Sequence, residues 1–427
     1  MSHLRRFILV VTAFLLAVTP TLAQFDQEIR QEVEDDIQDI RSLPLLEEFG
    51  VSTMSAEEYL ADTVDSLDTD YPPADRALDQ RVLIAFGLLD PEVDLGDAYT
   101  ALMGSSVAGY YDPFADEMVI VTTGDDDELG AFDQVTYAHE TVHAIQDQHF
   151  DLGAMLTSEE DMTTDESLAM RSLAEGDATV AELDYLLSDM ELARAYLDEL
   201  ESMDLDEDVL NDAPAFLSGT LMFPYTDGYE FVQFLHDEGG WDLVNEAYGN
   251  LPVSSEQIMH PELYLEGEDP IDVQVPDLSS SFGDDWSEID QDSMGEFVIS
   301  LMFGEGELSD EQAELSAAGW GGDAYSVIAN EDELAILWNT AWDSEEDAEE
   351  FARAMAVREG HRFDGEVTTN GDETLIEGDG VVVRIVQQGT DVTYQQATDL
   401  DTLALQTTGV TETAPAPDAT SAALKVD

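Results

Sequence analysis

Apolar residues recur every three or four positions through most of the region from residue 24 to residue 260. Over residues 24–45, the spacing of Ile29, Val33, Ile37 and Ile40 predicts an amphipathic helix. The same period predicts further helices after Pro72-Pro73 and over residues 132–148, 165–201, 229–237 and 254–259. The first part of the chain is therefore expected to be mainly helical.

Two other regions alternate with the period of a strand. Residues 105–123 predict a β-hairpin whose turn lies at residues 112–116. The C-terminal region predicts strands over residues 325–328, 334–342, 366–370, 381–387 and 391–396. A helix over residues 344–359 accompanies them, begun by Ser344 with Asp347 at the capping-box spacing.

These patterns predict an α+β fold in two domains. The larger domain spans residues 24–280 and ends at a Ser-rich linker over residues 279–283, and the smaller α+β domain spans residues 281–406. Residues 407–427 are rich in Thr, Ala and Pro and are expected to form a disordered tail.

The N-terminus has the pattern of an export signal. Arg5 and Arg6 precede an apolar run from Phe7 to Val18, and small residues follow near Ala23. We expect residues 1–23 to be a signal peptide, and the product to be secreted or located at the cell surface. No later segment is apolar enough to predict a membrane span.

Charge changes this picture more than any other property. The chain carries 98 acidic and 13 basic residues, a formal charge of −85, yet 44% of its residues are hydrophobic. Such a chain can bury a core, and at molar salt a Debye length of about 3 Å screens the repulsion. A halophilic protein with a solvated acidic shell is the expectation. Nucleic acid and anionic membrane surfaces are unfavourable partners, because no basic patch exists to meet phosphates.

One motif inside the 132–148 helix carries chemistry. His139-Glu140-Thr141-Val142-His143 has the form H-E-x-x-H, which places two histidines on one helical face, where they can bind a zinc ion. Glu140 then lies within reach of an activated water as a general base. With only 7 histidines in 427 residues, about 0.01 chance matches are expected.

A catalytic zinc site needs a third protein ligand, and His149 is one candidate. It lies at the spacing of the pattern H-E-x-x-H-x-x-G-x-x-H, which uses a glycine to turn the chain back to the metal. That position is Gln146 here, so the helix should continue and carry His149 about 80° away from the face of His139. A histidine at the helix end, interacting with the helix dipole, is the favoured interpretation.

Glu175 is the stronger candidate. It lies in Ala174-Glu175-Gly176-Asp177-Ala178 on the next predicted helix, where a mid-helix glycine indicates a close approach of another segment. Glu182, seven residues later, lies near the same face and remains the alternative ligand. Asp177 is expected to support the site through hydrogen bonds rather than to bind metal.

Several motifs resemble a family of exported haloarchaeal surface proteins with a gluzincin-type metallopeptidase core. The matching stretches are residues 108–113, 139–150, 173–178, 255–262 and 318–323. The resemblance implies a zincin domain of the gluzincin kind, with zinc ligands His139, His143 and Glu175 and with Glu140 as catalytic base. One departure concerns Thr179, which stands where the thermolysin-like form has an aspartate.

The expected function is zinc-dependent hydrolysis of a peptide or protein substrate. Tyr225 and His260 are candidates for stabilising the tetrahedral oxyanion, against a purely structural role for each. The hairpin could pair with extended substrate by strand addition. The alternatives are a non-catalytic surface or adhesion protein with a structural zinc ion, and a zinc hydrolase for a non-peptide amide.

Overall fold

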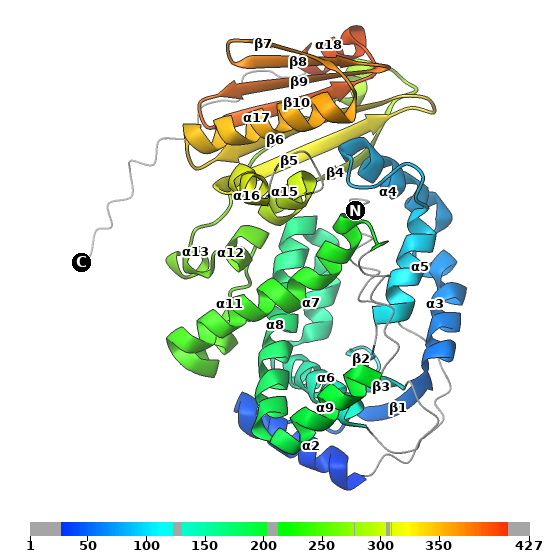
Figure 1. The fold of residues 1–427 in the computed structure, drawn as a ribbon, viewed down its shortest axis with the longest axis vertical. Helices are drawn as coiled ribbons and strands as arrows, with labels where there is room; N and C mark the ends of the chain where they lie inside the picture. Colours follow the sequence, from blue (N-terminus) through cyan, green and yellow to red (C-terminus); the bar gives the residue numbers. More distant parts are fainter. Residues whose placement is uncertain are drawn as a thin grey trace, which may run out of the picture.

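A computed structural model describes residues 27–106, 108–122, 130–202, 212–276, 278–304, 308 and 310–408. The predicted signal peptide and residues 409–427 of the predicted tail lie outside these described residues. The fold is α+β, with 59% helix and 19% strand. In Figure 1 a helical part lies below a large sheet, and helices α3 to α5 run along one side towards that sheet.

The first part contains eleven of the labelled helices in the described residues. They are α2 (Gln27–Arg41), α3 (Ala56–Asp70), α4 (Pro73–Phe86), α5 (Leu95–Ser106), α6 (Ala131–Phe150), α7 (Leu152–Ser158), α8 (Thr164–Ser188), α9 (Met190–Ser202), α11 (Ala215–Ala247), α12 (Ser255–Met259) and α13 (Pro261–Glu266). Helices α3, α5, α7 and α13 were not predicted, and α11 is longer than the predicted helix over residues 229–237. Within the described residues, no helix combines the length and apolar character that a bilayer span requires.

The long helical region predicted over residues 165–201 is two helices. Asp189 takes an extended conformation, with φ −121° and ψ 108°, and separates α8 from α9. Its carboxylate accepts a hydrogen bond of 2.7 Å from the Glu191 backbone N–H and so caps α9.

Helices α8 and α11 cross in close contact at two glycines. A Cβ atom on Gly176 would lie 2.0 Å from the carbonyl oxygen of Gly228, and one on Gly228 would lie 2.4 Å from the carbonyl oxygen of Ser172. A larger side chain at either position would force the two backbones apart. The close approach predicted at Gly176 is confirmed, and it holds the segment of α8 that carries Glu175.

A three-stranded sheet lies beside α6, in the order β1-β3-β2. Strands β2 (Gly109–Asp112) and β3 (Glu117–Thr122) form the predicted antiparallel hairpin, with Asp112 opposite Glu117. Strand β1 (Gly50–Ser55), which the sequence did not predict, pairs parallel to β3. This order leaves β2 at the edge of the sheet.

The C-terminal part is a seven-stranded sheet in the order β4-β5-β6-β10-β9-β8-β7 (Figure 1). Its strands are β4 (Ser287–Asp292), β5 (Trp320–Ala329), β6 (Leu334–Trp342), β7 (Glu366–Asn370), β8 (Glu373–Gly378), β9 (Val381–Gln388) and β10 (Asp391–Ala397). The helices of this part are α15 (Gly295–Gly304), α16 (Asp310–Ala317), α17 (Glu345–Arg362) and α18 (Leu400–Thr408). The expected linker at residues 279–283 instead contains the short helix α14 (Ser279–Phe282).

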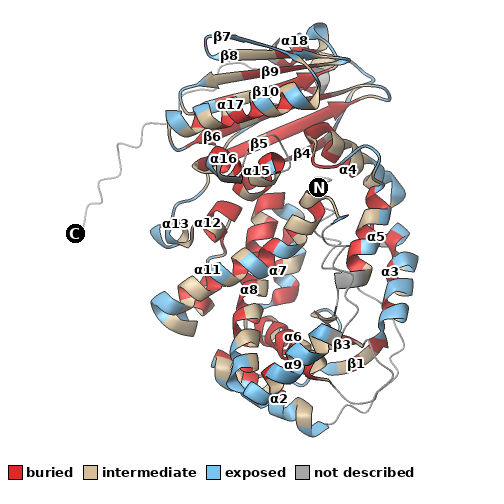
Figure 2. Ribbon diagram, viewed as in Figure 1, coloured by how far each residue is buried: buried red, intermediate tan, exposed pale blue. Residues whose placement is uncertain are grey.

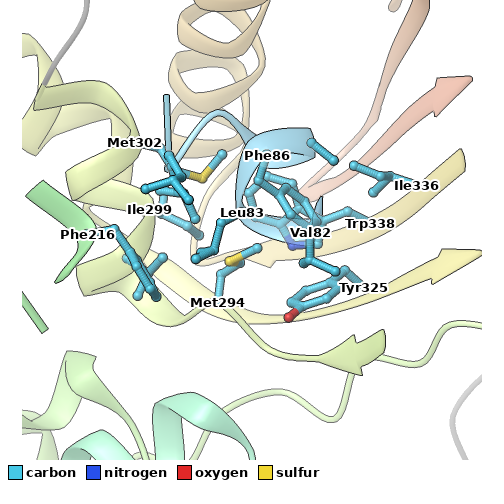
Figure 3. Packing of buried hydrophobic residues seen from close by; sticks show 14 of the residues in the cluster. Val82, Leu83, Phe86, Phe216, Met294, Ile299, Met302, Tyr325, Ile336 and Trp338 are labelled. Atoms are coloured by element: carbon cyan, nitrogen blue, oxygen red, sulfur yellow. The ribbon is translucent and has the colours of Figure 1, made fainter. Parts of the chain in front are cut away.

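Helix α4 packs into the core of the C-terminal sheet (Figure 3). The Phe86 ring lies 4.9 Å from the Tyr325 ring and 6.0 Å from the Trp338 ring, between ring centroids. The guanidinium groups of Arg358 and Arg362 donate hydrogen bonds to the last carbonyl groups of α4. One hydrophobic core therefore crosses the predicted domain boundary at residue 280.

Candidate metal centre

Helix α6 carries the H-E-x-x-H motif in the interior of the helical part. Figure 2 shows α6 and α8 largely buried, whereas α2 and α3 expose their outer faces. His139, Glu140 and His143 are only 8%, 6% and 9% exposed. Three polar side chains on adjacent turns of a buried helix need partners, because unpaired buried polar groups are unfavourable.

Glu175 of α8 supplies the nearest partner. Its Oε2 lies 3.2 Å from His139 Nε2 and 3.3 Å from His143 Nε2, and the two nitrogens lie 3.1 Å apart. Ligands at 2.0–2.1 Å around a tetrahedral zinc ion lie about 3.3 Å from one another. The three atoms therefore have the spacing of three corners of such a tetrahedron. Within the described residues, His139, His143 and Glu175 are the histidine and carboxylate side chains that could hold a metal ion, and they are called the metal group below.

The other ring nitrogen of each histidine has a hydrogen-bond acceptor. His139 Nδ1 lies 2.9 Å from Glu182 Oε2, and His143 Nδ1 lies 2.8 Å from Gln146 Oε1. Each acceptor favours a proton on Nδ1, which leaves the Nε2 lone pair directed at the common point. Glu182, the alternative ligand in the sequence, therefore orients His139 in this structure, and Thr179 instead bonds the Glu175 carbonyl.

The surrounding charges favour a positive charge at this point. Burial opposes protonation of both histidines, but hydrogen bonds and charges from Glu175 and Glu182 outweigh it and raise the pKa of His139 well above its usual value. Burial alone would raise the pKa of Glu175, but the two histidines hold it well below its ordinary value. A proton or a metal ion satisfies the same requirement.

Glu140 lies beside this group without joining it. Burial raises the pKa of its carboxyl group, and the charges of His143 and His139 oppose that rise. A carboxylate with a raised pKa, next to a metal group and at the wall of a cleft, is suited to accept and return a proton.

Two cavities that share part of their lining lie against the group, and they are together called the cleft. The larger part has a volume of about 310 Å³ and an apolar lining that includes Met103, Phe132 and Leu221. The smaller part, of about 140 Å³, extends past Tyr110 and Met155. The residues that border both parts are Gly109, Glu140, Arg171, Glu175 and Tyr225.

Tyr225 stands over the histidines, as the sequence predicted for a residue of the site. It follows Pro224 in α11, and its ring stacks on His139 with 6.1 Å between centroids. Although 37% of the residue is exposed, desolvation of its hydroxyl group at the site, the charges of Glu175 and Glu140, and a hydrogen bond to Glu175 raise the pKa of Tyr225 above its ordinary value. The Tyr225 hydroxyl therefore stays protonated and able to donate a hydrogen bond.

Arg171 was not predicted as a site residue. Among the described residues that line the cleft, Arg171 is the one with a permanently cationic side chain. Its Nη2 donates a hydrogen bond of 2.6 Å to Glu159. Its position four residues before Glu175 was the available signal, because residues four apart share a helix face.

His260 is not brought to the metal group. The structure places it between α12 and α13, where its Nε2 lies 3.2 Å from Glu296 Oε1 of α15. It lines neither part of the cleft. His149 also points away from the group, since its Nε2 lies 2.7 Å from the Pro44 carbonyl oxygen. Helix α6 continues without a turn at Gln146, and His149 lies in its last turn, as the favoured interpretation expected.

Comparison with known proteins gives one match. The sequence model of a family described as a domain of unknown function (DUF8575) matches residues 283–406, the region of the C-terminal sheet. No curated protein and no solved structure matches the chain. The candidate metal group of His139, His143 and Glu175 lies outside the matched region.

Proposed function

We propose that the protein is a zinc-dependent peptidase with a gluzincin-type centre formed by His139, His143 and Glu175. The observation that supports this most strongly is the mutual spacing of 3.1 to 3.3 Å among the three ligand atoms, next to an uninvolved carboxylate at Glu140. A purely structural metal site has no use for that carboxylate, and it is normally closed by four protein ligands rather than three.

The chain's own residues divide the work of hydrolysis. Zinc bound here would lower the pKa of water towards about 7 and polarise the scissile carbonyl group. Glu140 takes the proton of the attacking water and delivers it to the leaving amine nitrogen. The Tyr225 hydroxyl, which stays protonated, donates a hydrogen bond to the developing oxyanion. His260 has no part in this proposal, because it is paired with Glu296.

The substrate is proposed to be an extended peptide. Two cavities share Gly109, Glu140 and Tyr225 as lining, and their places on either side of these residues suit a substrate that extends past Glu140 in both directions. Strand β2 lies at a sheet edge, and its Gly109 borders both parts of the cleft. An edge strand can pair with the backbone of an extended substrate. Secretion and a halophilic habitat remain part of the proposal, on the N-terminal pattern and the charge of −85.

A non-catalytic surface protein with a structural zinc ion is the competing function. Proteolysis of an unfolded protein substrate in multimolar salt separates the two, with wild type, Glu140→Gln and the exposed-residue control Glu230→Gln compared. A peptidase requires zinc in all three proteins and a kcat about 10²- to 10⁴-fold lower in Glu140→Gln alone. Zinc in all three without cleavage of protein or of small amides would favour the structural role.

A further inference from the structure

A second arginine lies buried behind the metal group. Arg41, the last residue of α2, has no exposed surface, and its Nε and Nη2 donate bonds of 2.6 and 3.0 Å to the two oxygens of Asp177. Its Nη2 also bonds Asn245 at 2.7 Å, and its guanidinium lies 4.3 Å from the centroid of the Trp241 ring. Asp177 belongs to α8, two residues after Glu175.

Asp177 connects this arginine to the histidines. Gln146 donates from its Nε2 to Asp177 Oδ2 at 3.2 Å and to the Ala174 carbonyl oxygen at 2.8 Å. The Gln146 Oε1 is thereby left to face His143 Nδ1 at 2.8 Å. Both hydrogens of the amide point to acceptors, so a flipped amide would set its oxygen against two other oxygens.

Arg41 and the Ala174 carbonyl group together fix the directions of these hydrogen bonds. A guanidinium only donates and an ionised carboxylate only accepts, so Asp177 must accept from both Arg41 and Gln146, and it also accepts a 2.7 Å bond from the Tyr248 hydroxyl. The amide oxygen must then accept from His143, whose Nδ1 carries the proton. The lone pair of His143 Nε2 remains free to face Glu175 and His139.

We propose that Arg41 is a positioning residue for metal binding, which acts through Asp177 and Gln146 to fix the tautomer and orientation of His143. The inference rests on the proposed metal site and adds to it a dependence on the first described helix. If α2 is displaced, Asp177 is left as a buried charge without its cation, which is strongly unfavourable. Metal binding is therefore expected to depend on the packing of α2 against α8.

The test measures zinc affinity by competition with a chromophoric chelator in multimolar salt, together with the melting temperature. Arg41→Met is expected to weaken zinc binding about 10- to 100-fold. Arg41→Lys keeps the charge but not the bidentate contact, so its zinc affinity should lie between those of Arg41→Met and wild type. It also provides the test if Arg41→Met does not fold. Arg358→Met is the matched control, because it breaks a contact to Glu359 in the sheet part and should leave zinc affinity unchanged.

A double variant separates positioning from simple stabilisation. Arg41→Met with Asp177→Leu removes both buried charges, so stability should recover relative to Arg41→Met while zinc affinity stays low. Recovery of zinc affinity together with stability would overturn the proposal, as would wild-type affinity in Arg41→Met. Wild-type protein that binds no zinc would instead remove the proposed metal site itself, so the two failures are distinguishable.

Discussion

Asp323 in the sheet part and Glu175 in the helical part are both enclosed carboxylates, but their surroundings differ. Asp323 accepts hydrogen bonds of 2.8 to 3.1 Å from the backbone N–H groups of Met294 and Gly295, the Ser293 hydroxyl and two indole N–H groups. Every direction around it is filled by a donor. Glu175 instead faces the Nε2 atoms of two histidines, whose Nδ1 atoms face Glu182 and Gln146.

The difference separates a structural polar group from a chemical one. Donors that close around Asp323 satisfy its charge within the protein and tie α15 to the tryptophans of β5 and β6. Three acceptors that converge at the candidate metal group favour a positive charge between them, either a proton or a metal ion. Substitutions at Glu175 should therefore change zinc affinity, whereas substitutions at Asp323 should change the free energy of unfolding.

The largest effect is expected from Glu175→Gln. A neutral amide is a poor ligand, so zinc affinity should fall at least ~10³-fold, as measured by chelator competition. Glu182→Gln, on the same helix, should weaken binding only about 10- to 100-fold, because it orients His139 without binding metal. A larger loss in Glu182→Gln than in Glu175→Gln would show that the two roles are reversed.

Asp323→Ala should break the sheet part and leave the metal group intact. The change leaves two buried indole N–H groups and two backbone N–H groups without an acceptor, and stability should fall by about 3 kcal/mol in denaturant unfolding at high salt. Asp399→Ala, which removes an exposed helix cap, should lower stability less than Asp323→Ala. Loss of zinc affinity in folded Asp323→Ala protein would contradict the independence of the two regions.

Gly176→Ala should lower both stability and zinc affinity. The new Cβ would meet the Gly228 carbonyl oxygen, so α8 and α11 must separate, at a loss of about 1–3 kcal/mol in thermal unfolding. Zinc affinity should also fall, since Glu175 is the preceding residue. Gly104→Ala is the matched control in α5, where the added methyl meets only the tip of the Leu60 side chain. Equal stability of the two variants would count against the close helix crossing.

Glu256 is a third kind of buried carboxyl group, because its neighbours are other acidic side chains. Burial and the charges of Glu296, Asp343, Glu268 and Asp165 raise its pKa to about 9. The folded state then binds more protons than the unfolded state between about pH 4.5 and pH 9, so this group lowers stability as pH rises through that window.

Glu256→Gln should therefore stabilise the protein at pH 8, and the gain should vanish near pH 4.5. Calorimetric unfolding of both proteins across this pH range measures the difference. A gain of the same size at pH 5 and pH 8 would show that Glu256 is ionised in the folded protein at both values.

Local patterns sufficed for much of the fold. The apolar spacing and the Ser344 cap predicted α2, α6 and α17, and the β2–β3 hairpin was also predicted. Strand β8 was missed although Asn370-Gly371 is a hairpin signal, with Gly371 at φ 66° in the turn. Strand β1 had no such signal, because its partner β3 lies more than 60 residues away and its sequence is largely polar.

The site shows the same division between local and distant information. His139, Glu140 and His143 follow from one helical turn, and the glycine beside Glu175 marked the second helix. The role of Gln146 in orienting His143 was not predicted, because the sequence analysis considered Gln146 only as a residue that replaces a glycine of the longer zinc-binding pattern. Arg41 lies 136 residues from Asp177, and only the folded packing of α2 against α8 relates them. His260 was misplaced because a lone histidine before a proline carries no information about Glu296.

The zinc-to-protein ratio of folded wild-type protein, purified in multimolar salt and measured by elemental mass spectrometry, tests the central claim most directly. The account predicts about one zinc ion per chain in wild type and in Glu140→Gln, and a ratio near zero in a His139→Ala, His143→Ala double variant that remains folded. A folded wild-type protein that takes up no zinc when the metal is supplied would contradict it.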